Sequence, residues 1–320
     1  MQALILAGGE GTRLRPLTNT VPKPVLPLAG RPHIAYVIDW LVRHGVDDIV
    51  ISCGFLAAGM REALQDVEAG VDIRYVEEPD ARGTAGAIRF AEDELGDRFL
   101  VLNGDVLCDL DLSKLVEVHE AAGARATIAL YPVDDPSAYG LVRRSEEGRI
   151  SEFLEKPDPD QIDTDEINAG AYVLERSVLE LIPPDREVSI EREVFPRLVG
   201  GELYGARLEG YWLDIGTQER FLQANWDILE GRVQATAGER IGAGVLIDDS
   251  ADVAERAVIG SNSMIGEGAI VSESVLLPEC RIGDHARLQG AILSARVKVE
   301  PTTAVEGLVV GEGETVGAAA

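Results

Sequence analysis

Aliphatic residues recur at every sixth position near the end of the chain, and this repeat constrains the possible fold more than any other feature. The strict series consists of Ile241, Ile247, Val253, Ile259, Ile265, Val271 and Leu277. A six-residue period predicts a left-handed parallel β-helix, because each side of its triangular coil contributes one inward-facing aliphatic residue. After Leu277 the register slips, and it recovers at Ile282, Leu288, Val299, Val305 and Val310.

Before this repeat, short apolar segments alternate with helix-like segments. We predict strands over residues 3–7, 48–52, 71–76 and 98–105, and helices over 31–44 (begun by Pro32), 56–67 and a stretch ending at Leu95. The alternation predicts an α/β domain with a Rossmann-like, mainly parallel sheet and helices on both faces. Longer excursions between residues 124 and 212 predict an inserted, partly antiparallel region. With a closing helix over 217–229, the first domain covers residues 1–230, followed by a linker at 231–239 and the β-helix at 240–320.

The first predicted strand runs directly into a glycine-rich loop. Gly8, Gly9 and Gly11 lack a Cβ atom, so the loop can turn sharply and direct backbone N–H groups at an anion. Arg13 follows with a permanent charge and a planar set of donors that matches phosphate oxygens. Lys23, between two prolines, adds a compact second charge. The stretch therefore predicts a phosphate-binding site at the carboxyl end of a strand.

The spacing excludes two common phosphate-binding loops. A Walker loop requires Gly-x-x-x-x-Gly-Lys-Ser/Thr, which the sequence lacks, and the dinucleotide fingerprint requires glycine where Leu14 stands. The string Gly-Gly-x-Gly-Thr-Arg-Leu, with Pro-Lys-Pro about ten residues later, resembles the signature of the sugar-phosphate nucleotidylyltransferases. These enzymes join a nucleoside triphosphate to a sugar 1-phosphate. The resemblance covers residues 1–230 almost continuously and is closest to the mannose-1-phosphate guanylyltransferases, through residues 78–79, 83–86, 167–172, 189–196 and 210–216.

This resemblance implies roles for particular residues. Those implied in catalysis are Arg13, Lys23, Asp105 and Lys156, and those implied in binding Mg²⁺ are Asp105 and Asp214. Residues implied in nucleotide binding are Leu6, Gly8, Gly9, Gly11, Thr12, Arg13, Glu78, Gly83 and Thr84. Residues implied in binding the sugar 1-phosphate are Gly140, Glu155, Lys156, Asn168 and Gly170. Within these sets, Arg13 is expected at the β- and γ-phosphates and Lys23 near the α-phosphate.

Glu78 bears on the choice of base. Relatives that use thymidine or adenosine nucleotides typically carry glutamine there. A carboxylate only accepts hydrogen bonds, so it suits the adjacent N1–H and N2 donors of guanine and repels the carbonyl of thymine or uracil. We therefore expect GTP and mannose 1-phosphate. A glucose-1-phosphate thymidylyl- or uridylyltransferase is the alternative enzyme, because no residue distinguishes mannose from glucose and the segment 80–82 is longer than usual in the family.

Composition limits the remaining functions. A formal net charge of −27 argues against nucleic acid and anionic membranes as partners. Cys53, Cys108 and Cys280 are widely spaced, as expected of reduced thiols in a cytoplasmic protein, and we expect neither a membrane span nor a leader. The β-helix predicts a homo-oligomer, because its coil ends are open and its faces flat.

Two other classes of function are weighed against the enzyme. A regulatory homologue that binds nucleotide sugar without turnover would have lost phosphate- or metal-binding residues, and none of the implied ones is missing here. A second, acyltransferase activity in the β-helix is disfavoured, because the repeat would give only about four or five coils and His285 is its sole histidine.

Overall fold

The computed structural model describes residues 1–54, 56–65 and 70–317. They form two compact units that alternate along the sequence. The first unit contains the described residues of 1–9, 37–57 and 68–212, and the second contains those of 10–36, 58–67 and 213–320. Parts of the predicted helix 56–67 and of the predicted β-helix 240–320 lie outside the described residues.

The first unit is built on a mixed sheet. Its strands are β1 (Gln2–Leu6), β4 (Asp48–Cys53), β5 (Asp72–Glu77), β6 (Arg98–Asn103), β8 (Ala126–Pro132), β9 (Gly140–Arg144), β10 (Ile150–Glu155), β11 (Glu166–Glu175) and β12 (Leu203–Arg207). The order is β10-β9-β11-β6-β1-β4-β5, with β8 beside β11 and β12 beside β8. A short strand, β7 (Val106–Cys108), follows β6 outside this sheet.

The parallel half of the sheet carries the predicted ligand edge. Strand β1 lies parallel to both β4 and β6, and β4 lies parallel to β5. These strands are near-continuous apolar runs because parallel sheets are covered on both faces. Gly8, Glu78 and Asp105 follow the carboxyl ends of β1, β5 and β6, as the sequence predicted.

The region between residues 124 and 212 supplies the antiparallel half, which confirms the prediction. Strand β11 runs antiparallel to β6, β8 and β9, and β9 and β10 form an antiparallel pair. Only β12 is parallel to its neighbour, β8.

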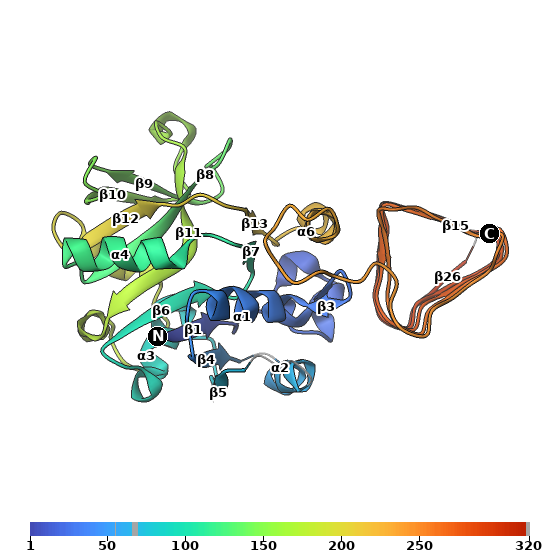
Figure 1. Ribbon diagram of the computed structural model, residues 1–320, viewed down its shortest axis with the longest axis horizontal. Coiled ribbons are helices and arrows are strands. Elements are labelled where there is room, and N and C mark those ends of the chain that lie inside the picture. Colours follow the sequence, from blue (N-terminus) through green and yellow to red (C-terminus); the bar gives the residue numbers. More distant parts are fainter. Residues whose placement is uncertain (55, 66–69, 318–320) are drawn as a thin grey trace. The chain divides into compact units, whose positions relative to one another are not determined.

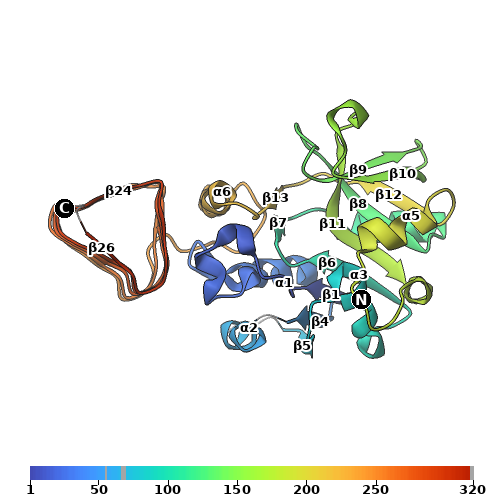
Figure 2. The same cartoon turned by 180° about the vertical axis from the view of Figure 1, so that it is seen from behind.

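Helices cover both faces of this sheet. The helical segments of the first unit are α3 (Gly83–Phe90), η4 (Glu92–Glu94), α4 (Leu112–Ala122), η5 (Pro159–Gln161), η6 (Arg176–Leu181), η7 (Ile190–Val194) and α5 (Phe195–Leu198). Helix α4 packs on β8, β11 and β12 in front of the sheet in Figure 1, and α5 lies in front in Figure 2, which is seen from behind. The core that α3, η7 and α5 form with the sheet contains Tyr172, Phe99 and Phe195, all fully buried.

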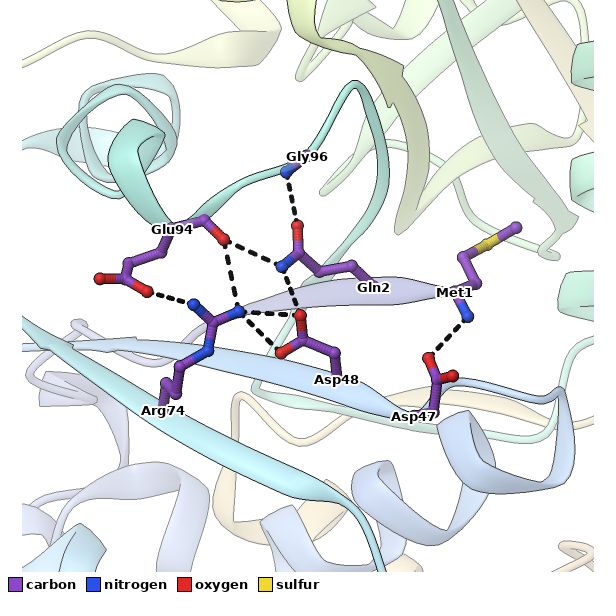
Figure 3. A network of polar contacts seen from close by, with 7 residues as sticks. All are labelled: Met1, Gln2, Asp47, Asp48, Arg74, Glu94 and Gly96. Carbon is purple, nitrogen blue, oxygen red and sulfur yellow. Dashed lines mark hydrogen bonds and ion pairs between the residues drawn. The ribbon is translucent and has the colours of Figure 1, made fainter.

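A polar network links neighbouring strands near their amino ends (Figure 3). Arg74 of β5 donates from Nη2 to both carboxylate oxygens of Asp48 at 2.8 Å and pairs with Glu94. Gln2 of β1 donates from Nε2 to Asp48 Oδ2 at 2.7 Å. The network therefore links β1, β4, β5 and the turn after α3.

Several elements belong to the second unit or continue into it. Those of the second unit are η1 (Thr12–Leu14), η2 (Leu17–Asn19), η3 (Lys23–Val25), β2 (Pro27–Leu28), β3 (Arg31–Pro32) and α6 (Gln218–Leu229), and the shared ones are α1 (His33–Arg43), α2 (Ala57–Leu64) and β13 (Trp212–Asp214). The prediction that Pro32 begins helix α1 was wrong. Pro32 lies in β3, where it faces Pro27 in an antiparallel pair, and α1 begins at His33.

The second unit ends in parallel coils with a triangular cross-section, seen in orange and red in Figure 1. Their strands are β14 (Leu246–Ile247), β15 (Asp252–Val253), β16 (Ala257–Ile259), β17 (Met264–Ile265), β18 (Ile270–Ser272), β19 (Ser274–Leu276), β20 (Arg281–Ile282), β21 (Arg287–Gln289), β22 (Ile292–Leu293), β23 (Lys298–Val299), β24 (Ala304–Glu306), β25 (Val309–Val310) and β26 (Thr315–Val316). They form three parallel sheets, β14-β17-β20-β23-β26, β15-β18-β21-β24 and β16-β19-β22-β25. This is the architecture of the predicted left-handed β-helix.

The interior of the coils corrects the predicted register at one point. Ile259 stacks in register on Leu276, not on Leu277, and Leu276 then stacks on Leu293. The slip therefore occurs before Leu277, in the segment that follows Val271. The coil from Ile265 to Ile282 is one residue shorter than the coil from Ile247 to Ile265, so the shortened segment brings Leu276 inward. No helix among the described residues is long and apolar enough to cross a membrane.

Candidate active site

In the second unit, Arg13 and Asp214 lie on the same short stretch of surface. The guanidinium of Arg13 lies directly over Gly216, where a Cβ atom would come within 2.7 Å of Nη2. Asp214 stands two residues earlier, and its Oδ1 lies 3.9 Å from Nζ of Lys23. The structure thus groups three of the charged residues that the sequence selected.

The local chain conformation explains how Arg13 and Lys23 are held. Gly11 adopts φ +61°, and a Cβ atom there would meet the side chains of Lys23 and Thr18 at 3.0 Å. The Thr18 hydroxyl donates to the Gly11 carbonyl at 2.9 Å. Leu14, the last residue of η1, is buried and anchors the turn that carries Arg13 and the exposed Thr12.

Lys23 is a buried cation, with only 8% of its side chain exposed. Burying an ammonium group is costly unless an opposite charge lies near it, and Asp214 supplies that charge. Asp214 is also not needed to cap the following helix, because Thr217 is the N-cap of α6 and accepts from the Arg220 N–H. The capping role that would compete with ligand binding therefore belongs to another residue.

In the first unit, Glu78 approaches the glycine loop. A Cβ atom on Gly8 would lie 3.2 Å from Oε1 of Glu78, so the absence of a side chain on Gly8 admits this carboxylate. The Ser52 hydroxyl at the end of β4 donates to the same oxygen at 2.7 Å. Burial raises the pKa of Glu78, while the Ser52 hydrogen bond and the charge of Arg82 oppose the rise.

Arg82 marks the unusual segment before α3. Its guanidinium lies 4.3 Å from the centroid of the Phe90 ring, and Nη1 is 3.7 Å from Asp185. The buried Nε atom makes no hydrogen bond within the described residues. The extra residues noted in the sequence thus add a largely buried cation whose charge acts on Glu78.

Gly83 and Thr84 begin α3 under tight constraint. Gly83 has φ +66°, and a Cβ atom there would lie 2.6 Å from the carbonyl oxygen of Val188. The Thr84 hydroxyl donates to Glu191 Oε2 at 2.8 Å and accepts from the Ile190 N–H at 2.8 Å. The Thr84 hydroxyl therefore makes one hydrogen bond as a donor and one as an acceptor, both to other residues of the protein.

Asp105 follows β6 through a close backbone contact. The Gly104 N–H donates to the Leu6 carbonyl at 2.9 Å, and a Cβ atom on Gly104 would lie 2.8 Å from that oxygen. Gly104 therefore allows the backbone after β6 to lie close to the end of β1. Next to it, the buried Oδ1 of Asn103 has no hydrogen-bond partner among the described residues.

The predicted sugar-binding residues gather around the ends of β9, β10 and β11. Gly140 faces Glu155 in register, and a Cβ atom on Gly140 would lie 3.1 Å from Oε2 of Glu155. Lys156 has φ +54°, an unusual value for a residue with a side chain, and its N–H donates to the Tyr139 carbonyl at 3.0 Å. Such backbone outliers concentrate at functional sites.

Asn168 and Gly170 are joined directly on β11. The Gly170 N–H donates to Asn168 Oδ1 at 2.9 Å, and Asn168 Nδ2 donates to the hydroxyl of Tyr172 at 2.9 Å. Burial raises the pKa of the Glu155 carboxyl, and the charge of Glu191 raises it further. Glu191 therefore lies within electrostatic range of Glu155.

Sequence reasoning did not select Ser52, Tyr172 or Glu191. Ser52 could have been found as the polar last residue of a predicted strand at the ligand edge. Glu191 lies within residues 189–196, which carried part of the family resemblance without being given a role. Tyr172 likewise lies within residues 167–172, which carried part of the resemblance, but it was given no role because an aromatic residue in a buried strand is ordinarily part of the core.

That Asp105 and Asp214 bind a divalent cation remains a prediction from the sequence. The described residues contain no group of three or more histidine, cysteine, aspartate or glutamate side chains able to hold a metal ion. Magnesium commonly takes one or two carboxylates and completes its shell with water and substrate phosphates, so single aspartates suffice.

Comparison with known proteins decides the family. Residues 2–231 match the family model described as nucleotidyl transferase, and residues 239–319 match the model described as GMPPB C-terminal domain. The chain belongs to the nucleotidyl transferase family. Members of this family typically use a divalent metal ion.

Curated relatives extend over nearly the whole chain. The mannose-1-phosphate guanylyltransferase of Mycobacterium tuberculosis is 37% identical, and the alignment covers 96% of this chain and 83% of the relative. The mannose-1-phosphate guanyltransferase of Schizosaccharomyces pombe is 41% identical over 92% of this chain and 85% of the relative.

Solved structures match the first part of the chain. HddC from Yersinia pseudotuberculosis, in a complex with GMP-PN, is 28% identical with a TM-score of 0.62, covering 71% of this chain and 98% of that one. A putative glucose-1-phosphate thymidylyltransferase from Bacillus anthracis, in complex with a sucrose, is 30% identical with a TM-score of 0.63, covering 71% and 94%.

Proposed function

We propose that the protein condenses GTP with mannose 1-phosphate to give GDP-mannose and pyrophosphate. The observation that carries this proposal is the similarity to relatives named for that reaction, which spans both the nucleotidyl transferase part and the C-terminal part of the chain. The grouping of Arg13, Lys23 and Asp214 supports it, because the reaction brings two polyanions together.

The chemistry is an in-line displacement at the α-phosphorus. A phosphate oxygen of mannose 1-phosphate forms the new P–O bond, and the bond between the α-phosphorus and the bridging oxygen of pyrophosphate breaks. The attacking oxygen is already anionic, so the step needs no general base. Catalysis rests on positioning and on neutralising charge.

We assign the cations to the phosphates in the order of the reaction. Arg13 binds the β- and γ-phosphates of GTP, Lys23 the α-phosphate region and Lys156 the phosphate of the sugar. Mg²⁺ held by Asp105 and Asp214 would neutralise charge on the triphosphate when bound.

The remaining predicted residues bind the two substrates. We assign the nucleotide to Leu6, Gly8, Gly9, Gly11, Thr12, Glu78, Gly83 and Thr84, and the sugar to Gly140, Glu155, Asn168 and Gly170. Glu78 accepts from the N1–H and N2 donors of guanine, and the Ser52 hydroxyl fixes its orientation.

A glucose-1-phosphate thymidylyltransferase is the second candidate. It is favoured by the similarity to the Bacillus anthracis protein of that name, which is 30% identical. Mannose and glucose differ in the orientation of one hydroxyl, so both sugar phosphates belong in the test.

Pyrophosphate release tests the proposal. Purified protein with Mg²⁺ is assayed with GTP, dTTP, UTP and ATP, each crossed with mannose 1-phosphate and glucose 1-phosphate. The proposal requires the highest kcat/KM for GTP with mannose 1-phosphate. Preference for dTTP or UTP with glucose 1-phosphate overturns the assignment of substrates, and release with no pair overturns the enzymatic function in favour of a regulatory homologue.

The setting of the enzyme follows from the rest of the chain. We propose a catalytic domain of residues 1–230, a linker of 231–239 and a β-helix of 240–320 through which copies of the chain associate. Leu246, Met264 and Ile270 are exposed apolar residues on the coils, and such patches favour association. The buried thiols of Cys53, Cys108 and Cys280 suit the reducing cytoplasm, where we place the protein.

A further inference from the structure

Glu191 is a charged side chain at the sugar-binding residues that has no role in the assignment above. It belongs to η7, a π-helical turn, and its side chain is half-buried. Short π-helical segments are costly and occur frequently at functional sites. The contacts of its two carboxylate oxygens are unequal, and this inequality points to a ligand.

One oxygen of Glu191 is firmly held. Oε2 accepts from the Thr84 hydroxyl at 2.8 Å and from the Ser189 hydroxyl at 2.7 Å. The Thr84 hydroxyl is itself fixed by the Ile190 N–H at 2.8 Å. Two charge-assisted hydrogen bonds to one oxygen fix the orientation of the whole carboxylate.

The other oxygen is weakly engaged. Oε1 of Glu191 has a single contact within the described chain, 3.5 Å from the hydroxyl of Tyr172, which is too long for a strong hydrogen bond. The Tyr172 ring is fully buried and packs edge-on against Phe195, with 5.1 Å between centroids, so it cannot move closer freely. A carboxylate oxygen has about two acceptor sites, and within the described residues the contact with Tyr172 uses at most one of those on Oε1.

The surroundings of Oε1 are those of the proposed sugar site. Tyr172 connects Glu191 to Asn168, and the charge of Glu191 acts on Glu155. Gly140 lies against Glu155, because a Cβ atom there would come within 3.1 Å of Glu155 Oε2. Two carboxylates that only accept hydrogen bonds thus lie near each other in a half-buried site, which suits a molecule rich in hydroxyl donors.

We propose that Oε1 of Glu191 accepts a hydrogen bond from one ring hydroxyl of the sugar 1-phosphate and that Glu191, with Glu155, selects the sugar. This inference rests on the proposed function, because it takes the sugar to bind at Glu155, Asn168 and Gly170. The two carboxylates also repel the phosphate of the substrate, so the ring enters with its hydroxyls toward them.

The test combines the variant Glu191→Gln with sugars that lack one hydroxyl. We expect the KM for mannose 1-phosphate to rise roughly 10- to 100-fold, with the KM for GTP unchanged. A panel of monodeoxy mannose 1-phosphates then identifies the hydroxyl concerned. For one analogue, the variant and the unaltered protein should have the same KM, because the lost hydroxyl was the partner of Glu191.

Glu193→Gln is the matched control. Glu193 lies in the same π-helical turn, but its carboxylate is engaged by Arg186 and the Ser189 N–H. We expect its substitution to leave the pattern across the deoxy panel unchanged. Glu191→Asp, which keeps the charge on a shorter side chain, should show an intermediate KM and serves if the glutamine variant does not fold.

Two results overturn the inference. One is an equal loss for every deoxy analogue in Glu191→Gln, which a merely structural role would give, and the other is an unchanged KM for the sugar. If the unaltered protein prefers glucose 1-phosphate, the proposed substrate fails and the same panel is built on glucose. If it turns over no pair, calorimetric titration with GDP-mannose replaces kinetics, and equal Kd values for protein and variant overturn the inference.

Discussion

Glu78, which we propose reads the base, lies in an environment that disfavours its charge. Its Oε1 lies against Gly8 and accepts from Ser52, while burial raises its pKa above the ordinary value of 4.5. A protonated Glu78 would offer one donor where guanine requires acceptors. If Glu78 reads guanine as proposed, recognition requires this carboxyl to be ionised.

The first prediction concerns Glu78→Gln and pH. As the pH falls through the raised pKa of Glu78, the acceptor is lost, so kcat/KM for GTP should fall with a midpoint above 4.5. In Glu78→Gln this fall of kcat/KM at low pH should be absent. The variant's kcat/KM for GTP should be about 10- to 100-fold lower than that of the unaltered protein, and its discrimination against dTTP and UTP should be weaker. Initial rates at saturating sugar phosphate from pH 4.5 to 8 measure both effects. The exposed neighbour, Glu77→Gln, is the control, and an unchanged preference for GTP in Glu78→Gln contradicts the assignment.

The second prediction concerns Asp214. This residue lies near the buried Lys23 and two residues before Gly216, over which the Arg13 guanidinium lies. Asp214→Asn removes a charge that we propose binds Mg²⁺ and that lies 3.9 Å from Nζ of Lys23. We expect kcat to fall about 100-fold and the Mg²⁺ concentration for half-maximal activity to rise at least about tenfold. A titration of Mg²⁺ after removal of metal with EDTA measures the shift, with the exposed Glu209→Gln as control. A loss of kcat at unchanged Mg²⁺ dependence would show that Asp214 acts through Lys23.

Single residues could be selected from the sequence where the chemistry of the side chain itself indicates a role. Arg13 and Lys23 were selected from their charges beside the glycine-rich loop, and Asp214 was selected through the family resemblance. Gly104 admits the Leu6 carbonyl, a contact that the sequence could not reveal because it does not say which atom approaches a glycine. Glu191 was missed because its partners, Thr84 and Tyr172, are distant along the chain.

At the scale of elements, the sheet of the first unit separates stability from function. Its carboxyl edge carries Gly8, Glu78 and Asp105, whereas its amino edge carries the network of Gln2, Asp48, Arg74 and Glu94 (Figure 3). Changes at the amino edge should therefore affect folding and not substrate binding.

The third prediction tests this separation with Arg74→Met. The side chains of Arg74 and Asp48 are 41% and 34% exposed, so the ion pairs are screened, and we expect a loss of about 1 kcal/mol in the free energy of unfolding. The KM values and kcat should not change. Urea denaturation and steady-state kinetics measure the two quantities. Arg89→Met breaks a single pair with Glu92, three residues later in the chain, and should cost less because no network is lost. Equal losses would mean that the network adds nothing.

Elements were predicted well where one periodicity dominates. The buried runs of β1, β4 and β6 and the aliphatic repeat of the coils each gave the correct element. The shift from Leu277 to Leu276 was not visible, because both residues are leucine and both are buried. Neighbouring coils decide which one stacks on Ile259, and that contact depends on the length of the preceding segment.

At the scale of the molecule, contacts between distant segments organise the chain beyond what local patterns reveal. The Ala29 N–H donates to Asn225 Oδ1 at 2.7 Å, which ties the segment after Lys23 to helix α6. Gly238 packs against Ala29 so closely that a Cβ atom would lie 2.4 Å away. Neither contact follows from hydropathy or spacing, so the assignment of residues 10–36 to the second unit required the structure.

The last prediction concerns assembly through the coils. Leu246 and Met264 face each other in register on neighbouring strands, and their exposed fractions of 62% and 44% are high for such apolar residues. The next strands of the same sheet place Arg281 and Lys298 at this position, so the apolar patch is confined to the first coils. A patch rimmed by charge favours a specific contact over aggregation.

We expect the protein to form a homo-oligomer at micromolar concentration. The double variant Leu246→Glu with Met264→Glu should dissociate it, because the two new carboxylates on each copy would repel those of the other copy across a symmetric contact. Light scattering after size-exclusion chromatography measures the mass. Thr315→Glu, at the corresponding position of the last strand of this sheet, is the control and should leave the mass unchanged. Activity per chain should persist in the double variant, since neither residue belongs to the proposed catalytic machinery. A monomeric unaltered protein, or a double variant of unchanged mass, would remove this patch as the site of assembly.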